Sequence, residues 1–324
     1  MIQRGRIPQT LLLSGPEGVG KATLARRFGA MLVGDAARIE QDDLSLEANI
    51  AVIADREKWP SDKRNEDPLL FSSHPDFVTF PPDGPLRQLT IQQMRLLKER
   101  ASLLPLKGAW RVFLIDGIDR ANEHAANSLL KTLEEPPAHL ILILTARNPY
   151  DLLPTIRSRA VPLPLGRLSE DEMRAFAAAR AVDQAEARLR LAEGSPGAAF
   201  ALDLEAYRRR REAMLALLRV ASGLDPFGAW MKHADSIAAR RTEKLDSYLN
   251  VMYILLEDVL RCANGVSPLR NEEARPHIQA VAHRVSFDWL RAAVARVDEL
   301  MDLLRRNIQK SLALDAFAAA LRAR

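Results

Sequence analysis

Phosphate chemistry is the first possibility that the sequence offers. Residues 14–23 read Ser-Gly-Pro-Glu-Gly-Val-Gly-Lys-Ala-Thr and follow directly after a short apolar run, residues 11–13. Glycines in such a loop let backbone N–H groups close around a phosphate, and the lysine adds a point charge. The candidate nucleotide-binding residues of this loop are Gly15, Gly18, Gly20, Lys21 and Thr23.

The same loop lacks one group that nucleotide hydrolysis needs. In the full motif a Ser or Thr hydroxyl follows the lysine and holds Mg²⁺, but this chain has Ala22. Thr23 comes next, yet one step along a helix turns a side chain by about 100°, so its hydroxyl is a poor substitute. The sequence therefore leaves open whether the loop still binds ATP, and it offers no magnesium ligand at position 22.

An acid and two arginines mark a second region with chemical potential. Asp116 ends the apolar run 112–115, and a second apolar run, 140–144, precedes Arg157 and Arg159. The carboxyl ends of strands in open α/β sheets face the ligand crevice. An acid at the end of such a strand is therefore placed for a cation or phosphate site.

Alternating strand and helix patterns position these residues. We expect four or five mostly buried strands before residue 165, among them 11–13, 76–80, 112–115 and 140–144. Apolar residues at spacings of three and four predict helices between them, and Thr90 with Gln93 has capping-box spacing. Residues 34–75 show no periodicity and are predicted to form an irregular insertion. The pattern indicates a parallel α/β sheet.

The composition changes after residue 164, and the rest of the chain is predicted to be helical. Ser169 and Glu172 form another capping-box pattern. A small helical unit is expected as far as Leu204, and amphipathic helices follow near 205–221, 226–239, 242–263, 286–307 and 311–323. The predicted fold class is α/β plus all-α, with domains at 1–165, 166–207 and 208–324.

Composition excludes several other classes of protein. A single cysteine, Cys262, allows no disulfide within the chain and no multi-cysteine zinc site. The six histidines form no HExxH pair, so no metal site is predicted. The first ten residues lack an apolar signal core and no apolar run could span a membrane, so a cytoplasmic location is expected. A net charge of +4 permits contact with nucleic acid without requiring it.

Three motifs together resemble the bacterial clamp-loader subunits of the AAA+ class. They are the glycine loop, the run LLKTLEEPP at residues 129–137, and Ser158-Arg159. The resemblance covers the whole chain, strongest over 10–30 and 110–165 and weaker at GSPG (194–197) and near 307–321. It implies a RecA-like core, a three-helix lid and a helical collar that joins five subunits into an open ring. The ring loads a sliding clamp onto primed DNA, so the implied partners are motor subunits, a delta subunit, the clamp and primer-template DNA.

Departures from that family's active pattern point to its non-motor member. In a motor subunit a glutamate follows the strand-end acid, whereas Gly117 follows Asp116 here. An arginine commonly follows GSPG in related sequences, whereas this chain has Ala198. The four-cysteine zinc module of the motor subunits is also absent from the sequence. By this resemblance the intrinsic ATPase activity is weak or absent.

By the same resemblance, Arg159 is an arginine finger that acts in trans on ATP held by a neighbouring motor subunit. The alternative is that Arg157 and Arg159 are surface arginines near a helix C-terminus. The run Arg208–Arg211 also has two possible interpretations: a solvated helix face, or a contact to DNA or a partner subunit. The expected function is a clamp-loader stator of the DNA polymerase III holoenzyme, without a polymerase site. A self-sufficient AAA+ ATPase and a plain DNA-binding protein are the alternatives.

Overall fold

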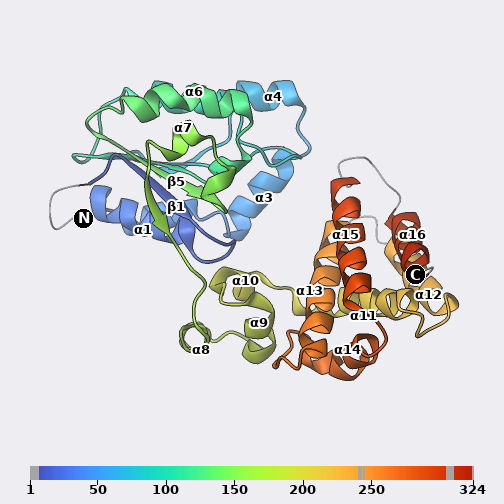
Figure 1. Ribbon diagram of the computed structural model, residues 1–324. Helices are drawn as coiled ribbons and strands as arrows, with labels where there is room; N and C mark the ends of the chain where they lie inside the picture. Colours follow the sequence, from blue (N-terminus) through green and yellow to red (C-terminus); the bar gives the residue numbers. More distant parts are fainter. Residues whose placement is uncertain (1–6, 240–242, 244, 304–309, 323–324) are drawn as a thin grey trace. The chain divides into compact units, whose positions relative to one another are not determined.

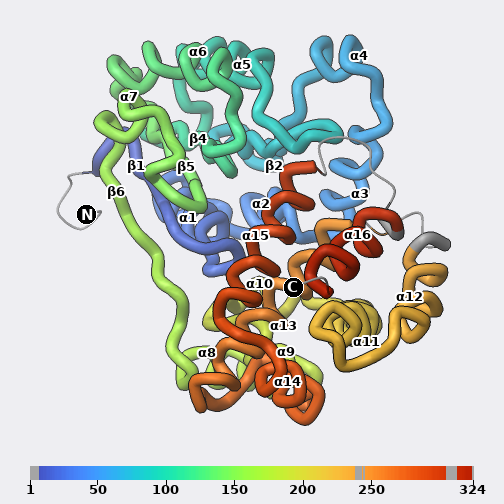
Figure 2. Tube along the Cα trace, turned by 45° about the vertical axis from the view of Figure 1, so that its right-hand side comes forward, coloured from blue at the N-terminus to red at the C-terminus, as the bar shows by residue number. Residues whose placement is uncertain are grey.

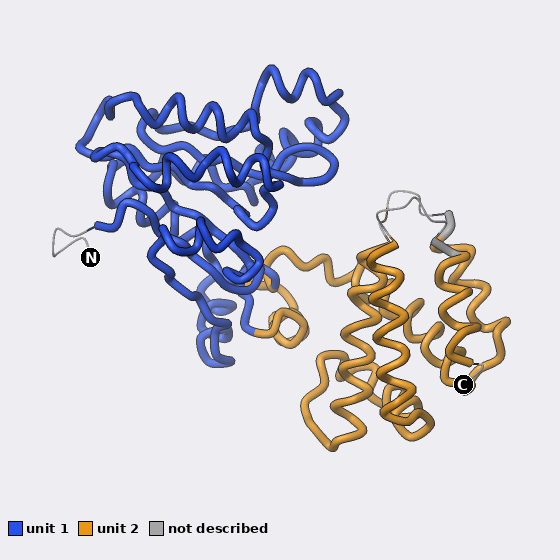
Figure 3. Tube along the Cα trace, turned by 45° about the horizontal axis from the view of Figure 1, so that its top comes forward, with its two compact units in different colours: residues 1–180, 194–198 blue, residues 181–193, 199–324 orange. Residues whose placement is uncertain are grey.

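Two compact units make up the chain in the computed structural model, which describes residues 7–239, 243, 245–303 and 310–322. Unit 1 contains residues 1–180 and 194–198, and unit 2 contains residues 181–193 and 199–324 (Figure 3). The three domains expected from the sequence, with boundaries near 165 and 207, stay a prediction.

A six-stranded sheet organises unit 1. In spatial order its strands are β2 (Phe71–His74), β3 (Phe77–Phe80), β4 (Arg111–Ile115), β5 (Leu140–Ala146), β1 (Thr10–Ser14) and β6 (Val161–Pro164). Only the pairing of β2 with β3 is antiparallel among these strands. The predicted parallel α/β sheet is confirmed, with one strand more than the four or five expected. The unpredicted β6 contains Pro162 and Pro164, which an edge strand tolerates.

Helices cover both faces of this sheet. Helices α5 (Ile91–Ala101) and α6 (Glu123–Glu134) lie on one face, and α1 (Lys21–Val33) lies on the other (Figures 1 and 2). Phe113 and Ile115 pack in the first layer, while Val112 and Leu114 pack in the second. Because successive side chains of a strand point to opposite faces, a strand buried on both faces is apolar throughout.

Residues 34–75 contain regular structure, so the prediction of an irregular insertion was wrong. The elements before β2 are α2 (Ala36–Ile39), η2 (Glu40–Asp42), α3 (Glu47–Arg56) and α4 (Ser61–Glu66). Polar contacts fix this segment to the sheet domain. The buried Arg26 of α1 pairs with Glu40 and Asp43, and the buried Arg56 pairs with Asp83. Such contacts between distant residues leave no periodic pattern in the sequence.

The remaining elements of unit 1 connect the sheet to its surface and to the following segment. They are η3 (Ile118–Arg120), η4 (Pro149–Asp151), α7 (Pro154–Arg157) and α8 (Glu170–Ala179). The predicted capping boxes at Thr90 and Ser169 are confirmed at the starts of α5 and α8. Helix α10 (Pro196–Ala201) begins within the GSPG segment, which belongs to unit 1 together with Ala198.

Among its described residues, unit 2 contains helices and their connecting loops but no strand. Its helices are α9 (Ala185–Ala192), α11 (Leu204–Ala221), α12 (Gly228–Ala239), α13 (Leu245–Ala263), η5 (Glu272–Ala274), α14 (Arg275–Ala282), α15 (Phe287–Leu303) and α16 (Lys310–Arg322). The expected helices are confirmed apart from their ends at 242, 304–307 and 323, which lie outside the described residues; α14 was not predicted. No helix in the described part of the chain is long and apolar enough to cross a membrane.

Gly29 sets how closely α1 can approach the sheet. A Cβ atom at this position would lie 2.2 Å from Cε2 of Phe77, which is completely buried in β3. We expect Gly29→Ala to destabilise unit 1 by about 1–3 kcal/mol, because the added methyl group would overpack the core between α1 and β3. At an open helical position the same change would stabilise by about 1 kcal/mol, so the sign of the shift tests the packing.

Thermal unfolding of the Gly29→Ala variant measures this effect. Gly108→Ala is the control, since a Cβ atom there would meet nothing within 4 Å. A melting temperature for Gly29→Ala equal to or above that of the wild type would contradict the close packing of α1 on β3.

Candidate functional site

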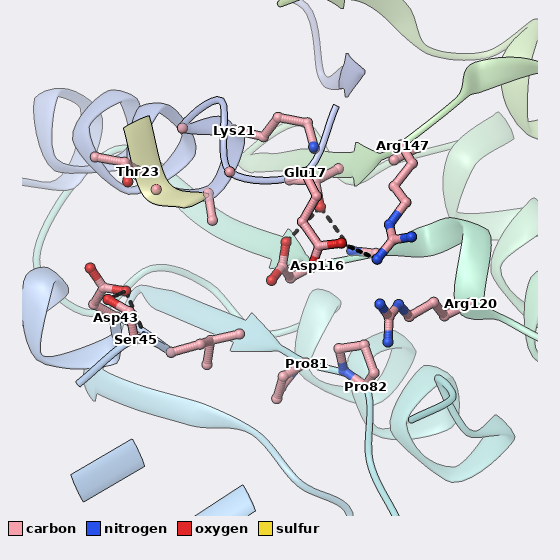
Figure 4. Close-up of a pocket in the computed structure, with 18 of the residues that line it drawn as sticks. Glu17, Lys21, Thr23, Asp43, Ser45, Pro81, Pro82, Asp116, Arg120 and Arg147 are labelled. Carbon is pink, nitrogen blue, oxygen red and sulfur yellow. Dashed lines mark hydrogen bonds and ion pairs between the residues drawn. The ribbon is translucent and has the colours of Figure 1, made fainter. Parts of the chain in front are cut away.

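Three parallel strands end side by side and bring the predicted chemical residues to one edge of the sheet. Ser14 of β1 pairs with Ala146 of β5, and Ile115 of β4 pairs with Leu144. The loops that follow these strands therefore surround a common cleft of about 570 Å³ (Figure 4). Of the predicted nucleotide-binding residues, Gly18, Gly20, Lys21, Thr23 and Asp116 line the cleft.

The glycine loop is held against the GSPG segment. Gly18 and Gly20 have φ values of +78° and +97°, in the left-handed region that favours glycine. The backbone N–H of Gly197 donates to the carbonyl of Gly18 at 2.8 Å. A Cβ atom on Gly18 would lie 2.7 Å from the backbone nitrogen of Ala198. Gly197 of the GSPG segment therefore lines the cleft.

Lys21 folds back onto the loop that it follows. Its Nζ atom donates to the carbonyl oxygens of Gly15 at 2.6 Å and Pro16 at 2.7 Å. Partial burial lowers the pKa of Lys21, while the nearby carboxylates of Asp116 and Glu17 oppose that shift. The ammonium thus stabilises the loop's own carbonyls in this arrangement, and a bound phosphate would have to compete for it.

Asp116 is fixed by a neighbour on β5 that sequence reasoning missed. The hydroxyl of Thr145 donates to Oδ1 of Asp116 at 2.6 Å and accepts from the backbone N–H of Gly117 at 2.8 Å. Burial raises the pKa of Asp116, and the hydrogen bond from Thr145 and the charge of Lys21 oppose the rise. The sequence signal for Thr145 was its place directly after the predicted strand 140–144.

The groups that would complete a hydrolytic site are not supplied here. Ala22 lines the cleft where a magnesium-binding hydroxyl would stand. Figure 4 shows Thr23 well apart from the Lys21 ammonium and from Asp116. Gly117 offers no carboxylate to orient water, and Ala198 offers no guanidinium. Within the described residues, His, Cys, Asp and Glu side chains form no group of three or more that could hold a metal ion.

The cleft is also lined by arginines that were not predicted from the sequence. Arg120 and Arg147 line it, and Figure 4 shows both on the side of Asp116 away from Thr23. Arg147 forms an ion pair with Glu17 of the glycine loop. The position of Arg147 directly after β5 is the sequence signal that could have predicted its place at the cleft. The cleft therefore combines positive charge with the glycine loop, although its acids offset much of that charge.

Arg159 lies just beyond α7, and the lining of the cleft, as far as the chain is described, does not include it. Its Nη2 atom donates to Oε1 of Glu134 at 2.6 Å, and its Nη1 atom donates to the carbonyl of Thr155 at 2.8 Å. About 32% of the side chain remains exposed. Arg157 is engaged elsewhere, with its guanidinium carbon 5.1 Å from the centre of the Tyr150 ring.

The arginine run on α11 is largely paired within unit 2. Arg208 and Arg211 form ion pairs with Glu273, and Arg210 pairs with Glu243. These glutamates neutralise much of the charge that a nucleic-acid contact would use. The geometry therefore favours the solvated, ion-paired interpretation of residues 208–211.

The sequence of this chain, with its incomplete glycine loop and its surface arginine, matches the sequence models of two protein families. The sequence model of the family described as "DNA polymerase III, delta subunit" matches residues 1–169 of the 324-residue chain. The model described as "DNA polymerase III, delta subunit, C terminal" matches residues 234–319. This chain belongs to the DNA polymerase III delta subunit family. The expected relationship to clamp-loader proteins of the AAA+ class is thereby confirmed.

Individual proteins that this chain resembles include delta' and gamma subunits of DNA polymerase III. The DNA polymerase III subunit delta' of Escherichia coli is 29% identical over 235 residues, which cover 72% of this chain and 69% of the relative. The gamma subunit of Buchnera aphidicola (Schizaphis graminum) is 31% identical over 169 residues, covering 52% of this chain and 41% of that protein. A crystal structure of a gamma subunit-related protein from Thermotoga maritima aligns with a TM-score of 0.47 at 16% identity, covering 98% of this chain and 95% of that one.

The raised pKa of Asp116 predicts a pH-dependent cost to stability in this family member. A carboxyl group whose pKa is higher in the folded state binds protons more readily there, so folding stability falls as pH rises above about 3.9 and through the folded value. Asp116→Asn keeps an oxygen that can accept from Thr145 but does not titrate. We therefore expect this variant to raise the melting temperature of unit 1 at about pH 8.

The gain should shrink as the pH falls toward about 4, where the wild-type carboxyl is also neutral. Calorimetry of both proteins across this range measures the difference, with Asp119→Asn as a control on the same cleft. A difference that does not change with pH would show that the charge of Asp116 costs the fold nothing.

Proposed function

We propose that this chain acts as the delta prime subunit of the bacterial clamp loader and donates Arg159 in trans to the ATP site of a motor subunit. It is then a largely non-hydrolysing stator of the DNA polymerase III holoenzyme in DNA replication. It carries no polymerase chemistry of its own. Its family and its delta' relatives support the assignment.

One contrast within unit 1 carries the proposal. The cleft keeps Lys21 and Asp116, yet Ala22 and Gly117 stand where hydrolysis needs a magnesium ligand and a water-orienting carboxylate. Arg159, in contrast, keeps a partly exposed guanidinium outside the cleft lining. A subunit that acts on ATP bound to a neighbour needs an exposed arginine and does not need a complete hydrolytic site of its own.

The chemistry of such an arginine is well defined. A guanidinium placed on a γ-phosphate stabilises the negative charge that develops on the transferring group in the transition state. Its planar fork can donate to two phosphate oxygens at once. A finger supplied from a neighbouring subunit is worth on the order of 10³–10⁵ in rate.

ATP enters this proposal mainly through the neighbouring subunit. The cleft of this chain suits a statically bound nucleotide at most, held by the loop of Gly15, Gly18, Gly20 and Lys21, without dependence on Mg²⁺. The partners that we propose are the tau/gamma motor subunits and the delta subunit, with the sliding clamp and primer-template DNA reached through the complex. The proposed location is the cytoplasm, where replication takes place in bacteria.

Replacement of Arg159 is the direct test of the proposed function. We expect Arg159→Ala to reduce the DNA- and clamp-stimulated ATP turnover at the neighbouring site by at least about 100-fold, because transition-state charge loses its partner. Assembly with the motor and delta subunits should remain intact, since the described contacts of Arg159 lie within unit 1 and leave its side chain partly exposed. Single-turnover hydrolysis in complexes with one competent motor site isolates the affected step.

Arg157→Ala is the matched control, because it removes a nearby arginine that contacts Tyr150 instead. It should leave turnover within about twofold of the wild type. Unchanged hydrolysis in the Arg159→Ala complex would return Arg159 to the surface-residue interpretation and refute its proposed role.

The rival function, a self-sufficient AAA+ ATPase, makes a different prediction for the isolated chain. We expect no steady-state ATP hydrolysis above background, since Ala22 and Gly117 remove two catalytic supports. Any equilibrium binding of ATP should be equally tight with Mg²⁺ and with a chelator, and should weaken in Lys21→Ala. Robust magnesium-dependent turnover, abolished by Lys21→Ala, would establish the rival function instead.

A further inference from the structure

We infer that Glu134 is a positioning residue for Arg159, which rests on the proposed function of Arg159 as a finger. Glu134 is the last residue of α6, and its carboxylate accepts from Nη2 of Arg159 at 2.6 Å. The two residues are 25 positions apart in the chain and belong to unit 1. Nothing in the proposed chemistry of the finger itself requires this acid.

Two separate elements hold the guanidinium of Arg159. The end of α6 provides Glu134, and the α7 region provides the carbonyl of Thr155 at 2.8 Å and the hydroxyl of Ser158 at 3.3 Å. Acceptors on both terminal nitrogens fix the position and the plane of the group. A long arginine side chain otherwise samples many rotamers, and that freedom has to be lost before it can meet a phosphate.

Donors remain for a ligand in this arrangement. A guanidinium has five N–H groups, and the described contacts engage Nη1 and one hydrogen of Nη2. The Nε hydrogen and the second Nη2 hydrogen are then the donors that can meet phosphate oxygens. The acid thus restrains the finger without using all of its binding capacity.

The position of Glu134 makes a purely stabilising role a poor explanation. The C-terminus of a helix carries partial negative charge, so an acid in the last turn is unfavourable there. Both Glu134 and Glu135 stand at this end of α6. About 49% of the Glu134 side chain is exposed, and such surface pairs contribute little to folding. Orientation of Arg159 accounts for an acid at this site better than fold stability does.

A double-mutant cycle in the assembled clamp loader tests this inference. We expect Glu134→Ala to lower the rate constant of ATP hydrolysis at the neighbouring site about 3- to 10-fold, with KM for ATP unchanged, because orientation acts on the transition state. Glu134→Gln keeps a hydrogen-bond acceptor and should recover part of the rate. In an Arg159→Ala background, Glu134→Ala should have no further effect.

Glu135→Ala is the control, since it removes the adjacent acid at the same helix end and should leave the rate unchanged. The single variant Arg159→Ala distinguishes a failure of the proposed finger role of Arg159 from a failure of the proposed positioning role of Glu134. If that variant hydrolyses ATP normally, the proposed function fails. If it is impaired but Glu134→Ala is normal, faster than the wild type, or additive with Arg159→Ala, then Glu134 does not position the finger.

Discussion

The register of three parallel strands is the constraint on which the site depends. Strand β5, which contains Thr145, lies between β1 and β4. The glycine loop after β1 and Asp116 after β4 are therefore each one strand spacing from it. Thr145 can then hold Asp116 and the backbone of Gly117 together. Burial disfavours the charges of both Lys21 and Asp116, and each opposes the shift in the other. A slip in the register would separate these groups.

The strands and the glycine loop could be predicted from the sequence because their signals are local. Apolar runs identified β4 and β5, and the spacing of Gly15, Gly20 and Lys21 identified the loop. The fold of residues 34–75 could not be predicted, because it depends on pairs such as Arg26 with Glu40 and Arg56 with Asp83. Those pairs connect residues that local periodicity does not relate.

The same distinction applies to the candidate site. Asp116 was predicted because it ends a recognisable strand, whereas the roles of Thr145 and Arg147 appear only when the strand order is known. The contact between Glu134 and Arg159 joins the ends of α6 and α7, which no spacing rule brings together. Motif reasoning therefore finds residues that belong to a local sequence pattern more readily than residues whose contacts depend on the tertiary fold.

Retention of part of the nucleotide motif has a structural explanation that does not need ATP turnover. Lys21 stabilises the carbonyls of its own loop, and Gly18 must stay small because Ala198 packs against it. Asp116 belongs to a hydrogen-bonded group with Thr145. Arg159 differs, because exposed ion pairs contribute only about 0–1 kcal/mol to folding. Contacts within unit 1 thus account for Lys21 and Gly18 without ATP turnover, whereas the small contribution of an exposed ion pair to folding is compatible with the role in trans that we propose for Arg159.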